Sequence, residues 1–479
     1  MAPDLMPHCT NKARSHHGPA WKCVLLGALL CGIGALLTGP AWGKAGDILW
    51  QREIDRATDS DQANALAAEG DRAYVAVAGP AYLVQAYDGE NGGLLWQDQP
   101  FDVPDFTSFA NAIAAADGRV YVAGRLQGAQ AFDILVRAYD GKTGCLLWQG
   151  LFDLAGLDDF AQAITIDKGH VYVGGVGTLR RPRPGDPGST AFLVLAFDAE
   201  DGRLLWQNSS EPSGQPQLNA VTSITADKEL VYAVGRHNDD SLVRAYDGDT
   251  GVLLWQDQEQ AAGFTAIGAE QGRVYASGFR NNGLVGFFFV RAYDGRSGAP
   301  LWQDLFTLAG IEDSSSAAIS ISGGRVYAVG SSTSGIDPGT GVTADFLVRA
   351  YEGATGALLW QDNFHGAGFR TNVALAVDSG PPAALHHRHT RGKAVYVGGF
   401  ATSAPHDTQF VVRAYGSETG VLLWKDEISR AGQNAALEVV VKDDRVYAAG
   451  RLTNTTDTTG NLFIRAYDAG CSAHTRERD

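Results

Sequence analysis

Residues 138–149 read AYDGKTGCLLWQ, and close copies of this stretch recur along the chain. The copies share a tryptophan that follows an apolar residue, at Trp50, Trp96, Trp148, Trp206, Trp255, Trp302, Trp360 and Trp424. The successive spacings are 46, 52, 58, 49, 47, 58 and 64 residues. Repeats of about 40–50 residues with insertions are typical of propeller blades rather than of helical arrays. The sequence therefore predicts eight β-blades.

Each repeat contains four short apolar segments separated by turn residues, which indicates a four-stranded antiparallel blade. In the second repeat we expect strands at 111–115, 119–124, 132–140 and 145–149. The strands contain adjacent apolar residues, such as Leu146 and Leu147, instead of a strict alternation. This pattern predicts strands that are buried on both faces between neighbouring blades.

The two ends of the repeat region are complementary. The region opens with GDILWQ at 46–51, which is a fourth strand alone, and closes with NLFIRAYDAG at 461–470, which is a third strand without its fourth. Pairing of these segments would complete the eighth blade and remove the exposed sheet edges. We therefore expect an all-β, eight-bladed β-propeller over residues 44–470, followed by a tail at 471–479.

Residues 1–43 differ from the rest and resemble a secretory signal peptide. Lys12, Arg14 and Lys22 precede the apolar run CVLLGALLCGIGALLTG, and small residues, Ala41 and Gly43, precede Lys44. Cleavage before Lys44 predicts a periplasmic or secreted protein. An uncleaved membrane anchor is the alternative, because the run is about 17 residues long.

Composition excludes some classes of function. The 59 glycines and 45% hydrophobic residues favour many tight turns, and a formal charge of −16 argues against nucleic-acid binding. Only Cys145 and Cys471 lie outside the leader, in blades that are not neighbours. We therefore expect a monomer held together by packing and not by disulfides.

The repeated stretch resembles the tryptophan-docking motif A-x-D-x-x-T-G-x-x-x-W of quinoprotein alcohol dehydrogenases and the wider PQQ-like propeller repeats. The resemblance covers residues 46–470, with Thr143, Thr250, Thr355 and Thr419 at the threonine position. It implies that the eight tryptophans are structural and hold each blade against the next. A buried indole has a large apolar area and one N–H that needs an acceptor, which agrees with this role.

The resemblance also raises the possibility of PQQ and Ca²⁺ as cofactors. The family's dehydrogenases use carboxylate and amide ligands for Ca²⁺, a catalytic aspartate and usually a disulfide of adjacent cysteines. This chain has no adjacent cysteines and no distinct acid–amide cluster. We therefore predict no catalytic residue and no bound cofactor, with a PQQ- and Ca²⁺-dependent dehydrogenase as the alternative.

Small polar residues recur ten positions before the tyrosine of the second strand, and first strands line a propeller's central channel. These candidate channel-lining residues are Asn64, Asn111, Gln162 and Thr265. We expect their side chains to form hydrogen bonds with backbone groups at the start of each strand, rather than to bind a sugar or metal ion in the channel. The recurrent Arg of VRAY and Asp of WQD are expected to form structural ion pairs.

Two further clusters are weak metal candidates. Asp158, Asp159, Glu312 and Asp313 lie in two similar linkers but do not match a calcium loop, so we expect solvated acidic turns. His386, His387 and His389 lie in an insertion at 380–393, where a solvated loop is favoured over a transition-metal site.

Length varies mainly in two classes of segment, namely the loops between second and third strands and the connections between blades. Both classes emerge on one face of a propeller, and variable loops on a rigid scaffold are typical of a binding surface. The most distinctive group there is Arg180, Arg181 and Arg183. We expect a non-catalytic scaffold that binds a protein or extracellular ligand through this face.

Overall fold

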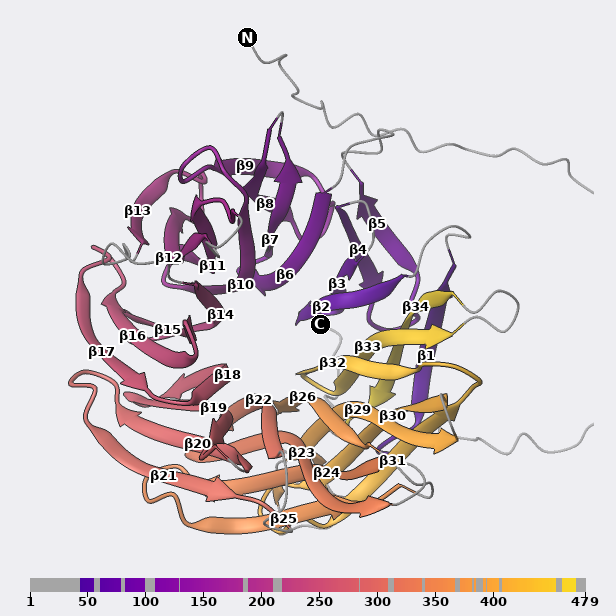
Figure 1. The fold of residues 1–479 in the computed structure, drawn as a ribbon. Coiled ribbons are helices and arrows are strands. Elements are labelled where there is room, and N and C mark those ends of the chain that lie inside the picture. Colours follow the sequence, from indigo (N-terminus) through magenta and orange to yellow (C-terminus); the bar gives the residue numbers. More distant parts are fainter. Residues whose placement is uncertain are drawn as a thin grey trace, which may run out of the picture. The chain divides into compact units, whose positions relative to one another are not determined.

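The computed structural model describes residues 44–470 apart from 56–60, 79–81, 100–107, 129, 184–187, 210–217, 284, 309–313, 338–340, 367–370, 381–382, 385–390, 393, 405–406 and 454–458. Within this part of the chain every regular element is a β-strand, and no helix is long and apolar enough to cross a membrane. The strands form eight four-stranded antiparallel sheets arranged in a ring (Figure 1). The predicted eight-bladed propeller is confirmed.

The blades follow the chain. Blade 1 contains β2 (Gln62–Glu69), β3 (Arg72–Ala78), β4 (Leu83–Asp88) and β5 (Leu94–Asp98). Blade 2 contains β6 (Ser108–Ala116), β7 (Arg119–Gln127), β8 (Phe132–Asp140) and β9 (Leu146–Phe152). Blade 3 contains β10 (Asp159–Asp167), β11 (His170–Arg180), β12 (Ser189–Asp198) and β13 (Leu204–Ser209). Blade 4 contains β14 (Asn219–Asp227), β15 (Leu230–His237), β16 (Asp240–Asp247) and β17 (Leu253–Glu259).

The second half continues in the same order. Blade 5 contains β18 (Ala262–Glu270), β19 (Arg273–Asn281), β20 (Gly286–Asp294) and β21 (Pro300–Phe306). Blade 6 contains β22 (Ser314–Ser322), β23 (Arg325–Asp337), β24 (Gly341–Glu352) and β25 (Leu358–Phe364). Blade 7 contains β26 (Val373–Ser379), β29 (Ala394–Ala404), β30 (Asp407–Gly416) and β31 (Leu422–Ser429), with the small hairpin β27 (Ala383–Ala384) and β28 (Arg391–Gly392) inserted. Blade 8 contains β32 (Ala435–Lys442), β33 (Arg445–Thr453), β34 (Gly460–Asp468) and, from the other end of the chain, β1 (Ile48–Ile54).

Blade 8 closes the ring as the sequence predicts. β1 pairs antiparallel with β34, with Trp50 opposite Ala466 and Ile54 opposite Leu462. The junction between blades 8 and 1 also contains an apolar cluster that includes Trp50 and Leu66. Blade 8 is therefore a complete four-stranded sheet built from both ends of the repeat region.

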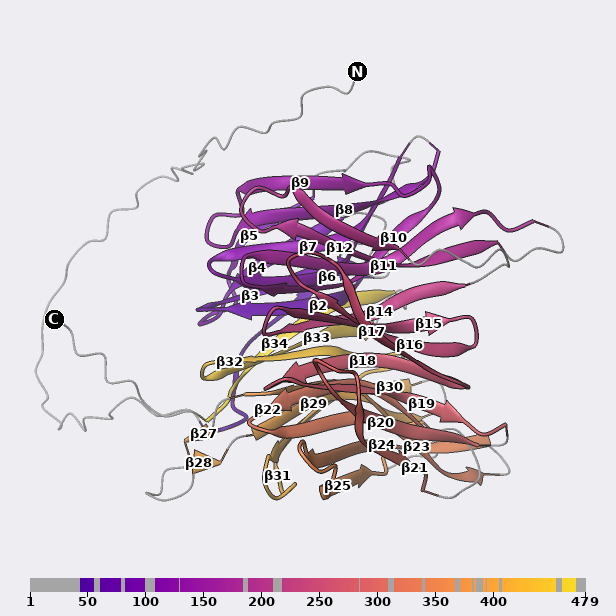
Figure 2. The same cartoon turned by 90° about the vertical axis from the view of Figure 1, so that its left-hand side faces the viewer.

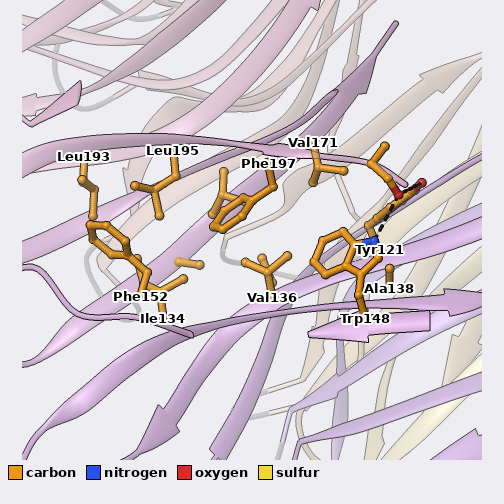
Figure 3. Close-up of a cluster of buried hydrophobic side chains, with 14 residues drawn as sticks. Tyr121, Ile134, Val136, Ala138, Trp148, Phe152, Val171, Leu193, Leu195 and Phe197 are labelled. Carbon is orange, nitrogen blue, oxygen red and sulfur yellow. Dashed lines mark hydrogen bonds between the residues drawn. The ribbon is translucent and has the colours of Figure 1, made fainter. Parts of the chain in front are cut away.

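The core consists of apolar clusters between adjacent blades. The eight junctions each contain one such cluster of buried residues. Figure 3 shows the cluster between blades 2 and 3, in which Trp148 lies beside Tyr121 and Val136 and faces Phe197 across the junction. Stacking of blades through these clusters stabilises the ring, since burial of apolar area is the main favourable term in folding.

The fourth strands differ from the prediction of burial on both faces. Leu147 is 44% exposed, and most of the equivalent leucine pairs on the outer strands are exposed too. Each outer strand has a bulge before its tryptophan, as between Ala138 and Tyr139 opposite Leu146 and Trp148, which leaves Leu147 unpaired. Neighbouring blades also diverge toward the rim of a ring, so they cannot cover both faces of the outermost strands.

Cysteine pairing also differs from the expectation of a fold without disulfides, because Cys145 is disulfide-bonded. The other cysteines, Cys9, Cys23, Cys31 and Cys471, fall outside the described residues, as do the predicted leader 1–43 and tail 471–479.

Candidate functional site

The two faces of the ring carry different kinds of segment. One face carries the loops between second and third strands and the connections between blades, and we call it the variable-loop face. The opposite face carries the turns between first and second and between third and fourth strands, and we call it the turn face. These turns are short except in blade 7, where the β27–β28 hairpin is inserted between β26 and β29. Figure 2 shows the ring from the side, with β11 and β12 extending beyond the other strands on the variable-loop face.

The eight predicted docking tryptophans lie on the fourth strands, at junctions between blades. Trp148 donates its indole N–H to the carbonyl of Ala199 in the next blade at 3.1 Å (Figure 3). Seven such bonds of 2.7–3.1 Å run from Trp50, Trp96, Trp148, Trp206, Trp255, Trp302 and Trp360 to Gly89, Gly141, Ala199, Gly248, Gly295, Gly353 and Ser417. These indoles therefore take part in the packing between blades.

The glycine of the docking motif is required by the indole. Gly202 has a φ of 74°, and a Cβ atom there would lie 2.5 Å from Cδ2 of Trp148. A side chain would therefore collide with the ring and strain the backbone. Sequence reasoning missed a second donor at the same carbonyl: the Tyr121 hydroxyl donates to Ala199 O at 3.2 Å. The repeated VY pair was the available signal.

The predicted pairing of the VRAY arginine with the WQD aspartate is confirmed at five junctions. Each arginine reaches back to the aspartate of the preceding blade, with N–O distances of 2.5–3.7 Å, in the pairs Arg137–Asp98, Arg291–Asp257, Arg349–Asp304, Arg413–Asp362 and Arg465–Asp426. The tyrosine two residues after each arginine donates to the same aspartate at 2.7–2.9 Å. These arginines therefore belong to the junctions and are not a basic binding ring.

The chain itself shows what happens when the aspartate is missing. Blade 2 has Gly150 at that position, and blade 3 has Leu195 and Phe197 in place of the arginine and tyrosine. Blade 3 has Asn208, and the facing Arg244 contacts Gln256 on its own blade, while the Tyr246 hydroxyl is buried and has no hydrogen-bond partner among the described residues. The aspartate, the arginine and the tyrosine hydroxyl of a junction thus depend on one another for their contacts, and we call them the Arg–Asp–Tyr unit.

The candidate channel-lining residues lie on the innermost strands around the ring axis, each at a bulge of its strand (Figure 1). Asn64 donates to Ala110 O at 2.9 Å, and Asn111 donates to Ala161 O at 2.8 Å, each on the next blade. Thr265 donates to Ser316 O at 2.9 Å in the same way. Gln162 occupies the equivalent position and is exposed. Three of the four thus satisfy backbone carbonyls across a junction.

A second polar ring, which sequence reasoning missed, fixes the variable-loop face. Three residues before the bulge, seven innermost strands have a buried polar residue, namely Asp61, Ser108, Asp159, Asn219, Ser314, Asn372 and Asn434. Asn434 accepts the N–H of Thr453 at 2.8 Å and donates to Thr408 O at 2.6 Å and Arg430 O at 2.8 Å. Such contacts hold the loops between second and third strands and the connections between blades against the start of the innermost strand. The loops of the variable-loop face are therefore held by specific hydrogen bonds.

The acidic linker of blade 3 was expected to be a solvated turn, and for Asp159 this is wrong. Asp159 is fully buried and accepts the N–H groups of Leu154 at 2.6 Å and Thr178 at 2.9 Å. Burial raises the pKa of its carboxyl to about 6. Asp158 accepts the Phe132 N–H at 3.0 Å, so both carboxylates organise backbone.

The other weak metal candidates, Glu312, Asp313, His386, His387 and His389, fall outside the described residues. Among the residues that are described, no group of three or more His, Cys, Asp or Glu side chains could hold a metal ion. We derive no catalytic step through PQQ.

One ionisable group stands apart on the innermost strands. Glu438 on β32 occupies a position that is alanine or serine in the other seven blades, namely Ala65, Ala112, Ala163, Ser223, Ala266, Ala318 and Ala376. Burial raises the pKa of its carboxyl from 4.5 to about 8. A carboxyl group at this position, with its pKa raised by burial, differs from anything that the repeat pattern predicts.

The candidate interface arginines lie at the end of β11, on the variable-loop face. Arg180, Arg181 and Arg183 are exposed, and Arg181 donates to Gln130 O of blade 2 at 3.2 Å. The β11–β12 hairpin therefore leans over the neighbouring blade and presents cationic side chains there. The strands of the β23–β24 and β29–β30 hairpins are at least as long.

Four-stranded blades joined through docked tryptophans define a PQQ-like β-propeller. The chain belongs to the family whose model is described as the outer membrane protein assembly factor BamB, which matches residues 41–175, 133–343 and 190–400. No curated protein sequence matches the chain.

Solved structures share the fold at low identity. The computationally designed Ika8 protein is 16% identical, with a TM-score of 0.53, and the match covers 88% of this chain and 100% of that chain. Quinohemoprotein alcohol dehydrogenase ADHIIG from Pseudomonas putida HK5 is 14% identical, with a TM-score of 0.52, over 90% of this chain and 77% of that chain. BamB from Moraxella catarrhalis is 15% identical, with a TM-score of 0.48, over 88% of this chain and 100% of that chain. The likenesses to Ika8 and to the alcohol dehydrogenase show the fold alone.

Proposed function

We propose that the protein is an exported, non-catalytic scaffold that binds a protein partner through the variable-loop face. The single observation that supports this most is the contrast between the faces. Docked indoles and turns that are short in every blade except blade 7 lie at one face, whereas buried polar anchors hold long and different loops on the other. Variable loops on a rigid scaffold are where binding surfaces usually lie.

The family supports the same class of function, since its model is described as an assembly factor. The β11–β12 hairpin adds exposed guanidinium groups, at Arg181 and Arg183, to a chain with a formal charge of −16. Arginine is enriched at protein interfaces, and a local cationic patch on an acidic protein favours one orientation of an acidic partner. Export rests on the leader at 1–43, and a periplasmic or secreted location is part of the proposal.

Shortening the β11–β12 hairpin tests the proposal. Arg180 pairs with Ser189, so replacing 181–188 by Asn-Gly would close the two strands directly. We expect the wild-type protein to co-purify with a specific partner from the exported fraction of its host and the shortened variant to lose it at unchanged melting temperature. Lys142→Ala, on the turn face, is the control and should retain the partner. Retention by the shortened variant would exclude this hairpin from the interface.

A further inference from the structure

A pocket of about 350 Å³ lies on the variable-loop face between blades 4 and 5. It forms because both segments that would cover it are short. β17 ends at Glu259 and β18 begins at Ala262, which is the shortest connection between blades, and β15 is joined to β16 by Asn238 and Asp239 alone. The open groove is a direct result of these two lengths.

The floor of the pocket is an aromatic platform. Phe279 on β19 pairs with Gly263 on β18, and a Cβ atom on Gly263 would lie 2.4 Å from Cε1 of the ring. The absence of a side chain at Gly263 therefore leaves room for the ring to approach the strand backbone. Phe279 is nonetheless 38% exposed and available for contact, while Phe264 beside it is buried.

Hydrogen-bond donors and acceptors both lie around this platform. Arg236 uses its Nε–H to bind Asn238 O at 2.6 Å, and no other contact of its guanidinium is seen among the described residues. Asp239 is exposed at the hairpin tip and forms no hydrogen bond or ion pair within the described part of the chain. Asn238 accepts the Leu218 N–H at 3.0 Å through its side-chain oxygen, and its side-chain NH₂ group remains available to donate to a ligand.

The charges decide what kind of ligand fits. Asp239 and Asp240 face a single lining cation, Arg236, so an anionic ligand would meet more negative than positive charge. Asp240 is already bonded to Gln258 at 2.8 Å and to the Ala261 N–H at 3.1 Å. The groups left over are therefore one guanidinium, one amide and one carboxylate, which suit a neutral ligand that both donates and accepts hydrogen bonds.

We propose that this pocket binds one end of a neutral saccharide, with a pyranose ring stacked on Phe279 and its hydroxyl groups bonded to Arg236, Asn238 and Asp239. The face of an aromatic ring is electronegative and attracts the C–H groups on the apolar face of a sugar. Pockets of a few hundred Å³ that are mainly apolar with a few convergent polar groups are typical of small-ligand sites. This inference goes beyond the proposed protein-binding function and does not depend on it.

Saturation-transfer NMR on the full exported chain tests the site with a defined panel. The probes are methyl α-glucopyranoside, methyl β-galactopyranoside, N-acetylglucosamine, maltose and cellobiose, with galacturonic acid and glucosamine as charged counterparts. We expect transfer to the ring protons of at least one neutral sugar. Phe279→Ala should raise its dissociation constant about tenfold, and Phe279→Leu, which still covers Gly263, should also weaken binding.

Val252→Ala is the matched control, because Val252 is an exposed apolar residue in a turn outside the pocket. It should leave sugar binding unchanged, and the melting temperatures of all variants show that they are folded. Binding of no neutral sugar, binding that is unaffected by both Phe279 variants, or binding of the charged sugars alone would each overturn the proposal.

Discussion

The backbone N–H of Gly46 donates to the carbonyl of Asp468 at 2.9 Å, joining the two ends of the described chain in one turn. Gly144 makes the same bond to Asp140 within the second repeat, at 2.8 Å. Gly46 thus takes the place of the docking glycine that the eighth motif lacks. It also lies under an indole, since a Cβ atom there would be 2.7 Å from Cγ of Trp424. Ring closure therefore rebuilds a complete docking motif from two chain ends.

Gly46→Ala should consequently destabilise the protein. Its φ of 87° and the indole contact both oppose a side chain, and we expect a loss of about 1–3 kcal/mol in the free energy of unfolding. Denaturant unfolding measures it. Gly156→Ala is the matched control, because Gly156 has a φ of 67° and no atom within 4 Å of the Cβ position. Equal losses in the two variants would mean that the indole contact contributes nothing.

The Arg–Asp–Tyr unit predicts a non-additive set of variants. Arg349 is 4% exposed and lies 3.1 Å from Asp304, so Asp304→Asn should leave a buried cation unpaired and cost about 1–3 kcal/mol. The triple variant Asp304→Gly, Arg349→Leu, Tyr351→Phe copies the natural junction of Gly150, Leu195 and Phe197. It should be more stable than the single variant in thermal unfolding. A triple variant with the summed losses of its parts would contradict the view that the three act together.

Replacement of Glu438 should give a gain in stability that depends on pH. Its folded-state pKa of about 8 lies above the ordinary 4.5, so the folded state binds the proton more tightly than the unfolded state. The associated stability is full below pH 4.5 and is lost progressively as the pH rises to about 8. Glu438→Gln stays neutral, so its stability relative to wild type should rise across this window by on the order of a few kcal/mol. Glu418→Gln, an exposed carboxylate, is the control; a flat difference for Glu438→Gln would refute the prediction.

Cofactor loading separates the scaffold from the quinoprotein alternative. We expect no dye reduction when the purified chain is incubated with PQQ, Ca²⁺ and alcohols or sugars, because the sequence has no adjacent cysteines and no distinct acid–amide cluster. Absorbance of an artificial electron acceptor is the readout, with a known quinoprotein as positive control. Substrate-dependent reduction would establish the enzyme and replace the scaffold.

The architecture could be predicted from the sequence because its decisive contacts are repeated. The tryptophan spacing and the complementary ends at 46–51 and 461–470 predict eight blades and their closure. Exposure of Leu147 was not predictable from the pattern, since it depends on a bulge and on how blades diverge toward the rim. A pair of leucines looks the same in the sequence whether both side chains are buried or one is exposed.

The candidate site was predicted less well, because it depends on segments that do not repeat. The variable-loop face follows from loop lengths, and Arg181 on it was identified from sequence alone. The pocket beside Phe279 was missed since it arises from two unusually short connections, whose effect appears only when blades 4 and 5 are side by side. Burial of Asp159 was missed for a similar reason, because backbone N–H groups leave no signature in the sequence.

Site-specific photo-crosslinking in the native host tests most directly whether the variable-loop face is the binding surface. A photoreactive residue placed at Arg181 should form a protein adduct, whereas one placed at Lys142, exposed on the turn face, should form none. Adducts from Lys142 with none from Arg181 would contradict the central claim.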